Sequence, residues 1–102
     1  MTDERVVRLL REMVAIESVN LAYPGGTGEA AMADYVETWA RGAGLRVERQ
    51  ELETGQANVL VTLDVPNATG TLLFEAHMDT VALAPMERAL DAEVRDGRVY
   101  GR

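Results

Sequence analysis

Cysteine is absent from the 102-residue chain. Its absence excludes disulfide frameworks, thiolate metal sites and cysteine nucleophiles together. A chain without thiols suits a reducing compartment, so we expect a cytoplasmic protein. Histidine is almost as scarce, because His77 is the only one. Any chemistry that needs an imidazole must therefore use this residue.

Positive charge and long apolar runs are also scarce. Lysine and arginine together number 10 against 17 aspartates and glutamates, and the net charge is -7. Such a surface repels polyanions, so we expect no nucleic-acid partner. No apolar stretch approaches the roughly 20 residues of a membrane span, and residues 1–4 are acidic where a secretory signal would be basic. The sequence therefore predicts no membrane partner.

Two stretches carry apolar side chains at helical spacing. Within residues 3–17, valine, leucine and methionine recur every three or four residues and leave the arginines outside. A second stripe runs from Met32 to Trp39, with Thr27 as the expected N-cap and Gly42 or Gly44 ending the helix. We expect each of these helices to bury one face.

Three later segments have strand patterns. Residues 45–48 alternate between apolar and charged side chains, residues 58–63 are rich in branched apolar side chains, and residues 71–76 are almost wholly apolar. The third segment, Leu72-Leu73-Phe74 above all, shows no polar alternation. We therefore expect it inside a sheet that is covered on both faces, as in α/β proteins.

The expected fold is a single small α/β domain. Asp96-Gly97 favours a two-residue turn between short strands around Val94 and Val99-Tyr100. A chain of this size has room for one modest core, since it buries only about two-thirds of its unfolded surface. The fold class that follows is α/β, with two amino-terminal helices packed on a small mixed sheet.

His77 and Asp79 are the residues that could carry chemistry. His77 directly follows the apolar segment 71–76, at the carboxyl edge where open α/β sheets place their ligands. The carboxylate of Asp79, two residues later, can accept the imidazole proton and fix the tautomer that binds a metal ion. A lone histidine near a core edge more often bonds a backbone carbonyl, and a bare His-x-Asp is a weak signal. The surrounding sequence is what favours the metal site.

Two segments closely resemble the amino-terminal part of the M20 metallopeptidases. This group contains acetylornithine deacetylase, succinyl-diaminopimelate desuccinylase, aminoacylase and glutamate carboxypeptidase. His77-Met78-Asp79-Thr80-Val81 is similar to the family's His-x-Asp-Thr-Val signature, and residues 96–102 are similar to the stretch that leads into its next metal motif. Weaker similarity covers residues 10–20 and Gly28-Glu29, so the resemblance extends over nearly the whole chain.

The resemblance implies that residues 1–102 form the first part of a zinc-peptidase catalytic domain, without the family's lid or dimerisation domain. It implies that His77 is a ligand of one of two zinc ions, with cobalt or manganese as alternative metals. It implies that Asp79 is the catalytic-site carboxylate that orients His77. The substrates implied are N-acyl amino acids or small peptides, hydrolysed at an amide bond, and a homodimer is one expected assembly of the full-length form.

The remaining functional groups of the family have no counterpart in the sequence. These are the metal-bridging aspartate, the glutamate pair that supplies the general base and a ligand, a further carboxylate and a distant histidine. A catalytic zinc ion needs about three protein ligands, so we expect the isolated chain to be inactive. The leading hypothesis is an amino-terminal fragment of the hydrolase; a free-standing, non-enzymatic α/β interaction module and one half of a split enzyme are the alternatives.

Overall fold

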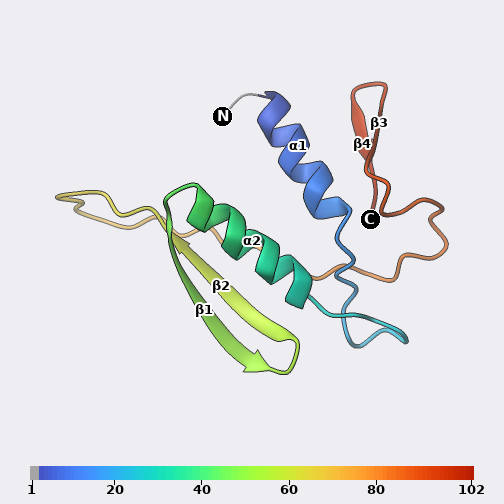
Figure 1. The fold of residues 1–102 in the computed structure, drawn as a ribbon, viewed down its shortest axis with the longest axis horizontal. Coiled ribbons are helices and arrows are strands. Elements are labelled where there is room, and N and C mark those ends of the chain that lie inside the picture. Colours follow the sequence, from blue (N-terminus) through green and yellow to red (C-terminus); the bar gives the residue numbers. More distant parts are fainter. Residues whose placement is uncertain (1–2) are drawn as a thin grey trace.

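Helices and short strands both occur in the chain, which is therefore a mixed α/β protein (Figure 1). The computed structural model describes residues 3–102. In chain order, the elements of this part are α1 (Asp3–Val14), α2 (Ala30–Gly42), β1 (Arg46–Glu53), β2 (Gln56–Thr62), β3 (Glu93–Arg95) and β4 (Arg98–Tyr100).

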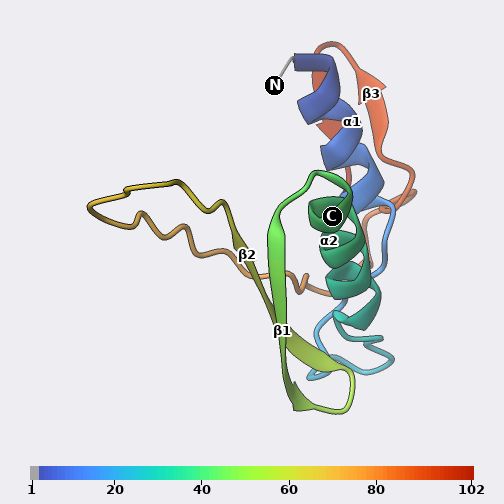
Figure 2. The ribbon, with the colours of Figure 1, turned by 60° about the vertical axis from the view of Figure 1, so that its left-hand side comes forward.

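The centre of the fold is an antiparallel hairpin covered by a helix. In the β1–β2 hairpin, Arg46 lies opposite Thr62 and Gln50 lies opposite Asn58. Helix α2 packs along one side of the hairpin (Figure 2). Ala57 of β2 is buried. The two strands predicted around residues 45–48 and 58–63 are therefore confirmed.

Helix α2 buries one face, as predicted, but its start differs from the prediction. Met32, Ala33 and Ala40 are buried. The residue at the N-cap position is Glu29, and its side chain makes no capping hydrogen bond. The hydroxyl of Thr27 donates instead to the carbonyl oxygen of Glu17, at 3.5 Å. The prediction that Thr27 caps this helix is wrong, because the side chain is turned back toward the preceding loop.

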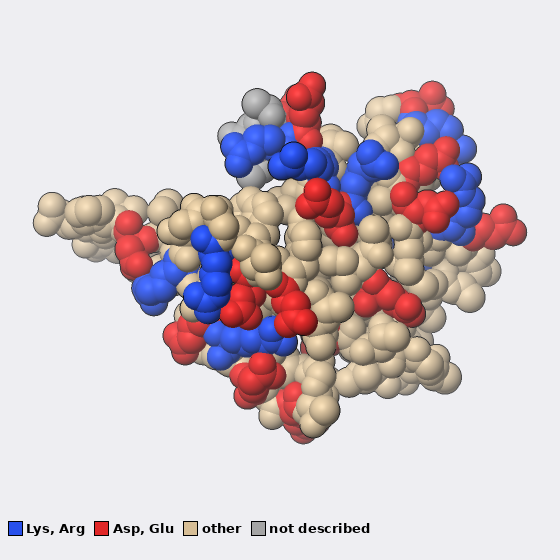
Figure 3. Space-filling view, viewed as in Figure 1, with Lys and Arg blue, Asp and Glu red and all other residues tan. Residues whose placement is uncertain are grey.

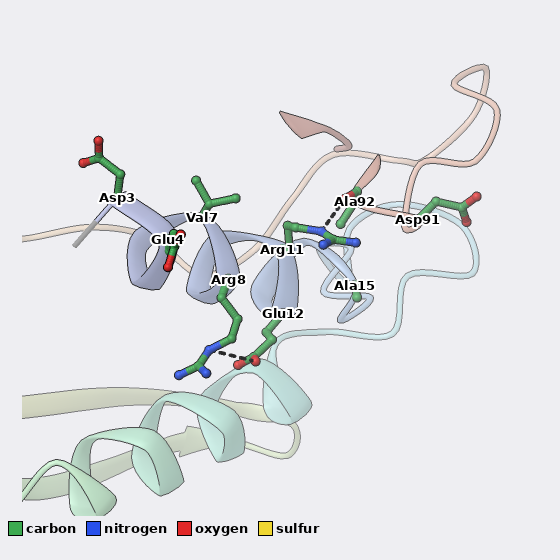
Figure 4. Close-up of a pocket in the computed structure, with 9 residues that line it drawn as sticks. All are labelled: Asp3, Glu4, Val7, Arg8, Arg11, Glu12, Ala15, Asp91 and Ala92. Carbon is green, nitrogen blue, oxygen red and sulfur yellow. Dashed lines mark hydrogen bonds and ion pairs between the residues drawn. The ribbon is translucent and has the colours of Figure 1, made fainter. Parts of the chain in front are cut away.

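Helix α1 forms where predicted but buries none of its residues. Its apolar stripe stays open to solvent, with Val6 and Leu10 each more than two-fifths exposed. Figure 4 shows the cavity beside this helix, of about 640 Å³, where the side chain of Arg11 reaches across to the segment before β3. The Nε atom of Arg11 donates to the carbonyl oxygen of Ala92 at 2.9 Å. The expected buried face of α1 is absent, because even the least exposed apolar residues of the helix, Leu9, Met13 and Val14, are only partly covered.

A tyrosine hydroxyl links the two helices. Tyr35 on α2 donates to the carboxylate of Glu12 on α1, at 2.5 Å. Burial, and then the hydrogen bond to Glu12, raises the pKa of Tyr35 from 10.0 to about 12. The folded state therefore holds the neutral phenol more firmly than the unfolded state does.

Replacing Tyr35 with phenylalanine should lower the free energy of unfolding by about 1 kcal/mol at neutral pH. Because the folded pKa is raised, this contribution is complete below pH 10 and is lost as the pH rises through about 12. Urea denaturation of the wild type and of Tyr35→Phe at pH 8 and pH 11 measures the change, with the exposed Tyr23→Phe as control. A Tyr35→Phe effect of equal size at both pH values would contradict the assignment.

The strand predicted at residues 71–76 does not form. Leu72, Leu73 and Phe74 expose 78%, 72% and 85% of their surface. Both ribbon views show this part of the chain as an arm that extends away from the helices (Figures 1 and 2). The prediction of a buried strand is wrong, because no described segment lies beside the arm to accept its backbone hydrogen bonds or cover its side chains.

The sheet is also simpler than predicted. β1–β2 and β3–β4 are two separate antiparallel hairpins, so the small mixed sheet is not formed. The β3–β4 hairpin itself is confirmed: Asp96 and Gly97 both have positive φ, at 51° and 71°. These values are typical of the two-residue turns that match the twist of a hairpin. Among residues 3–102, parallel pairing is limited to an isolated bridge between Val19 and Thr80.

The chain buries little of its surface. Its radius of gyration is 15.4 Å, whereas a compact domain of this length has about 13 Å. Its accessible surface is 7697 Å², against about 5,600 Å² for a folded monomer of this mass. The buried apolar side chains are mostly alanines. In the described part of the chain, no helix is long and apolar enough to cross a membrane.

Charged side chains of both signs lie side by side on one face of the molecule. Arginines and carboxylates alternate over the face drawn in Figure 3. Hydrogen bonds from Arg41 and then Arg49 lower the pKa of Glu37 on α2. A two-pronged pair joins Arg46 to Asp64, at 2.8 and 2.9 Å, and fixes the base of the exposed arm to the start of β1.

Candidate functional site

Two distant loops meet at the predicted site. The backbone N–H of Asn20 donates to the carbonyl oxygen of Thr80, and the backbone N–H of Thr80 donates to the carbonyl oxygen of Ser18, both at 2.9 Å. These bonds form the parallel bridge between Val19 and Thr80. Val19 and Ser18 are buried there. The loop after α1 is thereby held against the segment that carries His77 and Asp79.

His77 and Asp79 contact each other as predicted. The Nδ1 atom of His77 lies 2.9 Å from the carbonyl oxygen of Asp79 and 3.1 Å from its Oδ1 atom. Both partners can only accept a hydrogen bond, so Nδ1 carries the proton of the neutral imidazole. Nε2 then has a free lone pair. The His77 side chain is 84% exposed, which leaves this nitrogen accessible to a ligand.

Asp79 also receives a hydrogen bond that the sequence did not predict. The Nδ2 atom of Asn20 donates to Oδ2 of Asp79 at 2.7 Å. This bond, and then the one from His77, lowers the pKa of the Asp79 carboxyl below its ordinary value of 3.8. Asp79 is therefore ionised at neutral pH, and its carboxylate is an acceptor on both sides.

The same residues line a shallow cavity. It has a volume of about 490 Å³, and its lining consists of Asn20, Ala22, Tyr23, His77, Asp79, Thr80 and Val81. The cavity beside α1 is larger, but neither His77 nor Asp79 lines it. An imidazole with an oriented lone pair, backed by a carboxylate, fits the donor chemistry of a zinc ligand.

The described residues do not complete a metal site. Within residues 3–102, no three histidine, aspartate or glutamate side chains gather where they could hold a metal ion. The hydroxyl of Ser18, which is buried beside the site, has no hydrogen-bond partner among the described residues. The arrangement therefore consists of an exposed imidazole on His77, with the Asp79 carboxylate hydrogen-bonded to it and to Asn20.

Asn20 is the site residue that sequence reasoning missed. It lies 59 positions before Asp79, so no local pattern relates the two. The available signal was indirect, since Asn20 ends the stretch 10–20 that is weakly similar to the M20 family.

Comparisons with known proteins identify no relative of the chain. The chain matches no protein-family model, no curated protein and no solved structure. The resemblance of His77–Val81 and residues 96–102 to the M20 metallopeptidases therefore stays a prediction.

Proposed function

We propose that the chain carries one corner of a zinc-dependent amide hydrolase site, in which His77 is a metal ligand and Asp79 orients it. The observation that carries the proposal is the pair of contacts at 2.9 and 3.1 Å between Nδ1 of His77 and oxygens of Asp79. They keep the proton on Nδ1 and direct an accessible Nε2 lone pair outward. The resemblance adds the family, an M20-type enzyme of the cytoplasm, and its substrates, N-acyl amino acids or small peptides.

In the proposed site, the catalytic roles are shared between the metal ion and the side chains of the protein. A zinc ion held there would supply a water with its pKa lowered toward about 7 and a polarised scissile carbonyl. His77 would hold it through the Nε2 lone pair, while the Asp79 carboxylate accepts the Nδ1–H hydrogen bond and makes the imidazole a stronger donor. Residues 3–102 gather no further ligands around His77, so we expect the chain alone not to hydrolyse an N-acyl amino acid.

Zinc titration of the purified chain tests the proposal. Because His77 is the only histidine, its imidazole signals in a proton NMR spectrum need no assignment. We expect zinc to shift these signals, with an affinity about 10- to 100-fold above that of a histidine without a carboxylate behind it. The matched control is the double variant His77→Ala/Gln50→His, which moves the histidine to the exposed face of β1.

The two outcomes separate clearly. Tighter zinc binding by the wild type than by the relocated histidine supports a preformed ligand. Equal binding by the two chains, or zinc binding that persists unchanged in His77→Ala, would remove His77 from the proposed site.

A second function is favoured by a different observation. The side chains of Leu72, Leu73 and Phe74 are largely exposed, and the outer edges of the β1–β2 hairpin have no neighbouring strand among the described residues. Exposed apolar segments and unpaired sheet edges are typical of association surfaces. This favours a non-enzymatic α/β interaction module, with a second copy of the chain as the occupant.

A further inference from the structure

We infer that Asn20 is a positioning residue, which holds the Asp79 carboxylate in place and thereby selects the metal-binding tautomer of His77. The metal-binding part of this inference rests on the proposed function. The positioning part concerns only the hydrogen bonds of the chain, so it can be tested without metal.

The amide group of Asn20 has a defined orientation. Its Oδ1 atom accepts the backbone N–H of Ala22 at 2.7 Å. Because Oδ1 is occupied by a donor, Nδ2 must point the other way, and it donates to Oδ2 of Asp79 at 2.7 Å. A flipped amide would place Oδ1 against the carboxylate and Nδ2 against an N–H, so the flip is strongly disfavoured.

The backbone of Asn20 is fixed as firmly as its side chain. Its N–H donates to Thr80, and its carbonyl oxygen accepts the N–H of Tyr23 at 3.0 Å. The bond from Asn20 therefore comes from a loop that is tied to the backbone immediately after Asp79. It occupies one carboxylate oxygen and leaves the other, Oδ1, for the imidazole.

His77 has few other contacts that could select its tautomer. Its side chain is mostly exposed, and the two oxygens that lie within hydrogen-bond distance of Nδ1 both belong to Asp79. A free neutral imidazole prefers to carry its proton on Nε2, which blocks that nitrogen as a ligand. If Asp79 loses the Asn20 bond and rotates, the preference for Nδ1–H should weaken.

The experiment is nitrogen-15 NMR of the imidazole of the 102-residue chain at about pH 9, well above the ordinary histidine pKa of about 6.5. The two ring nitrogens report which one carries the proton. We expect the wild type to be mainly Nδ1–H. Asn20→Asp keeps the size and the acceptor for Ala22 but sets a carboxylate against Asp79, and we expect it to shift His77 toward Nε2–H.

Two further variants separate positioning from folding. Asn20→Ser keeps a local acceptor for the Ala22 N–H but is too short to reach Asp79, so it should shift the tautomer as Asn20→Asp does. The exchange Asn20→Asp/Asp79→Asn restores a donor and an acceptor between the two positions at unchanged net charge. We expect this double variant to regain the Nδ1–H form, because the new amide oxygen at position 79 can accept from the imidazole.

Metal binding gives the second readout. We expect Asn20→Ser to weaken zinc binding about 10-fold while the circular dichroism spectrum stays that of the wild type. A wild-type tautomer ratio in both single variants, or no recovery in the exchange variant, would overturn the positioning role. A tautomer shift without any change in zinc affinity would keep the positioning role and would count against His77 as the ligand, so the two proposals fail separately.

Discussion

Replacing Gly26 with alanine should destabilise the chain by about 3 kcal/mol, the upper end of the cost of overpacking a filled site. A Cβ atom at this position would lie 2.2 Å from the carbonyl oxygen of Asn20 and 3.1 Å from that of Tyr23. Both are backbone atoms within a hydrogen-bonded loop, in which Gly26 donates to Tyr23 and Tyr23 donates to Asn20. The clash can be relieved only by opening that loop.

The effect should extend to the candidate site, because Asn20 belongs to the same loop. We expect Gly26→Ala to lower the urea midpoint and also to shift the His77 tautomer toward Nε2–H. For a chain with so small a core, a loss of this size is a large share of the total stability. Wild-type stability in Gly26→Ala would show that the loop is not packed as described.

Gly42→Ala is the matched control for Gly26→Ala. The same methyl group is added at the end of α2, where a Cβ atom meets nothing within 4 Å. Alanine reduces the backbone entropy of the unfolded chain and favours the helix, so stability should rise by about 0.5–1 kcal/mol. Opposite signs for the two substitutions would show that contacts, and not a general intolerance of alanine, decide the result.

The parts of the fold that could be predicted from the sequence depend on neighbouring residues. Local periodicity predicted the apolar stripe of α2 and the alternation in β1. A local requirement for positive φ predicted the Asp96-Gly97 turn. Helix α2 and the Asp96-Gly97 turn form within about two residues of the predicted places, whereas β1 continues to Glu53, beyond its predicted end at residue 48. The N-cap of α2 was missed because Gly28, with a φ of 77°, breaks the helical backbone after Thr27, so the helix begins at Ala30 with Glu29 at the N-cap position.

The apolar segment 71–76 could not be placed for a different reason. Its apolar pattern predicts a strand that is buried on both faces. Such burial needs other segments to cover those faces, and the pattern does not say whether the same chain supplies them. The same holds for α1, whose apolar stripe is only partly covered by the other residues of the range 3–102. A local sequence pattern thus predicts the secondary structure and burial that a segment could adopt, whereas contacts with other segments decide whether it adopts them.

The candidate site divides in the same way. The pair of His77 and Asp79 is two residues apart, so the contact between them followed from spacing alone. The Asn20 bond joins segments 59 positions apart and depends on the bridge between Val19 and Thr80. The spacing of residues in the sequence does not predict this bridge between distant segments.

The wild-type chain should self-associate, and the double variant Leu72→Lys/Phe74→Lys should be monomeric at the same concentration. Leu72, Leu73 and Phe74 together expose roughly 500 Å², which is as large as the whole apolar patch of a typical monomer. Two such arms that cover each other or a sheet edge would bury on the order of 1,000–2,000 Å², the range of a stable interface. Sedimentation velocity of both chains measures the difference.

The substitutions should act on association and not on folding. Because the arm is exposed, the free energy of unfolding of the monomer should change by less than about 0.5 kcal/mol. Val6→Lys, on the open stripe of α1, is the control for adding a lysine to an exposed apolar residue. A wild type that stays monomeric at high concentration would remove the observation behind the interaction module and leave the metal-site proposal untouched.

The salt dependence of self-association distinguishes an apolar contact between two copies from an ionic one. Each copy carries a net charge of -7, so two copies repel one another, and the repulsion is screened as ionic strength rises. Association through Leu72, Leu73 and Phe74 should therefore strengthen in added salt. Association through arginine–carboxylate pairs should weaken, because the same screening reduces their attraction. A self-association that disappears in salt would assign the contact to the charged surface of Figure 3 and not to the arm.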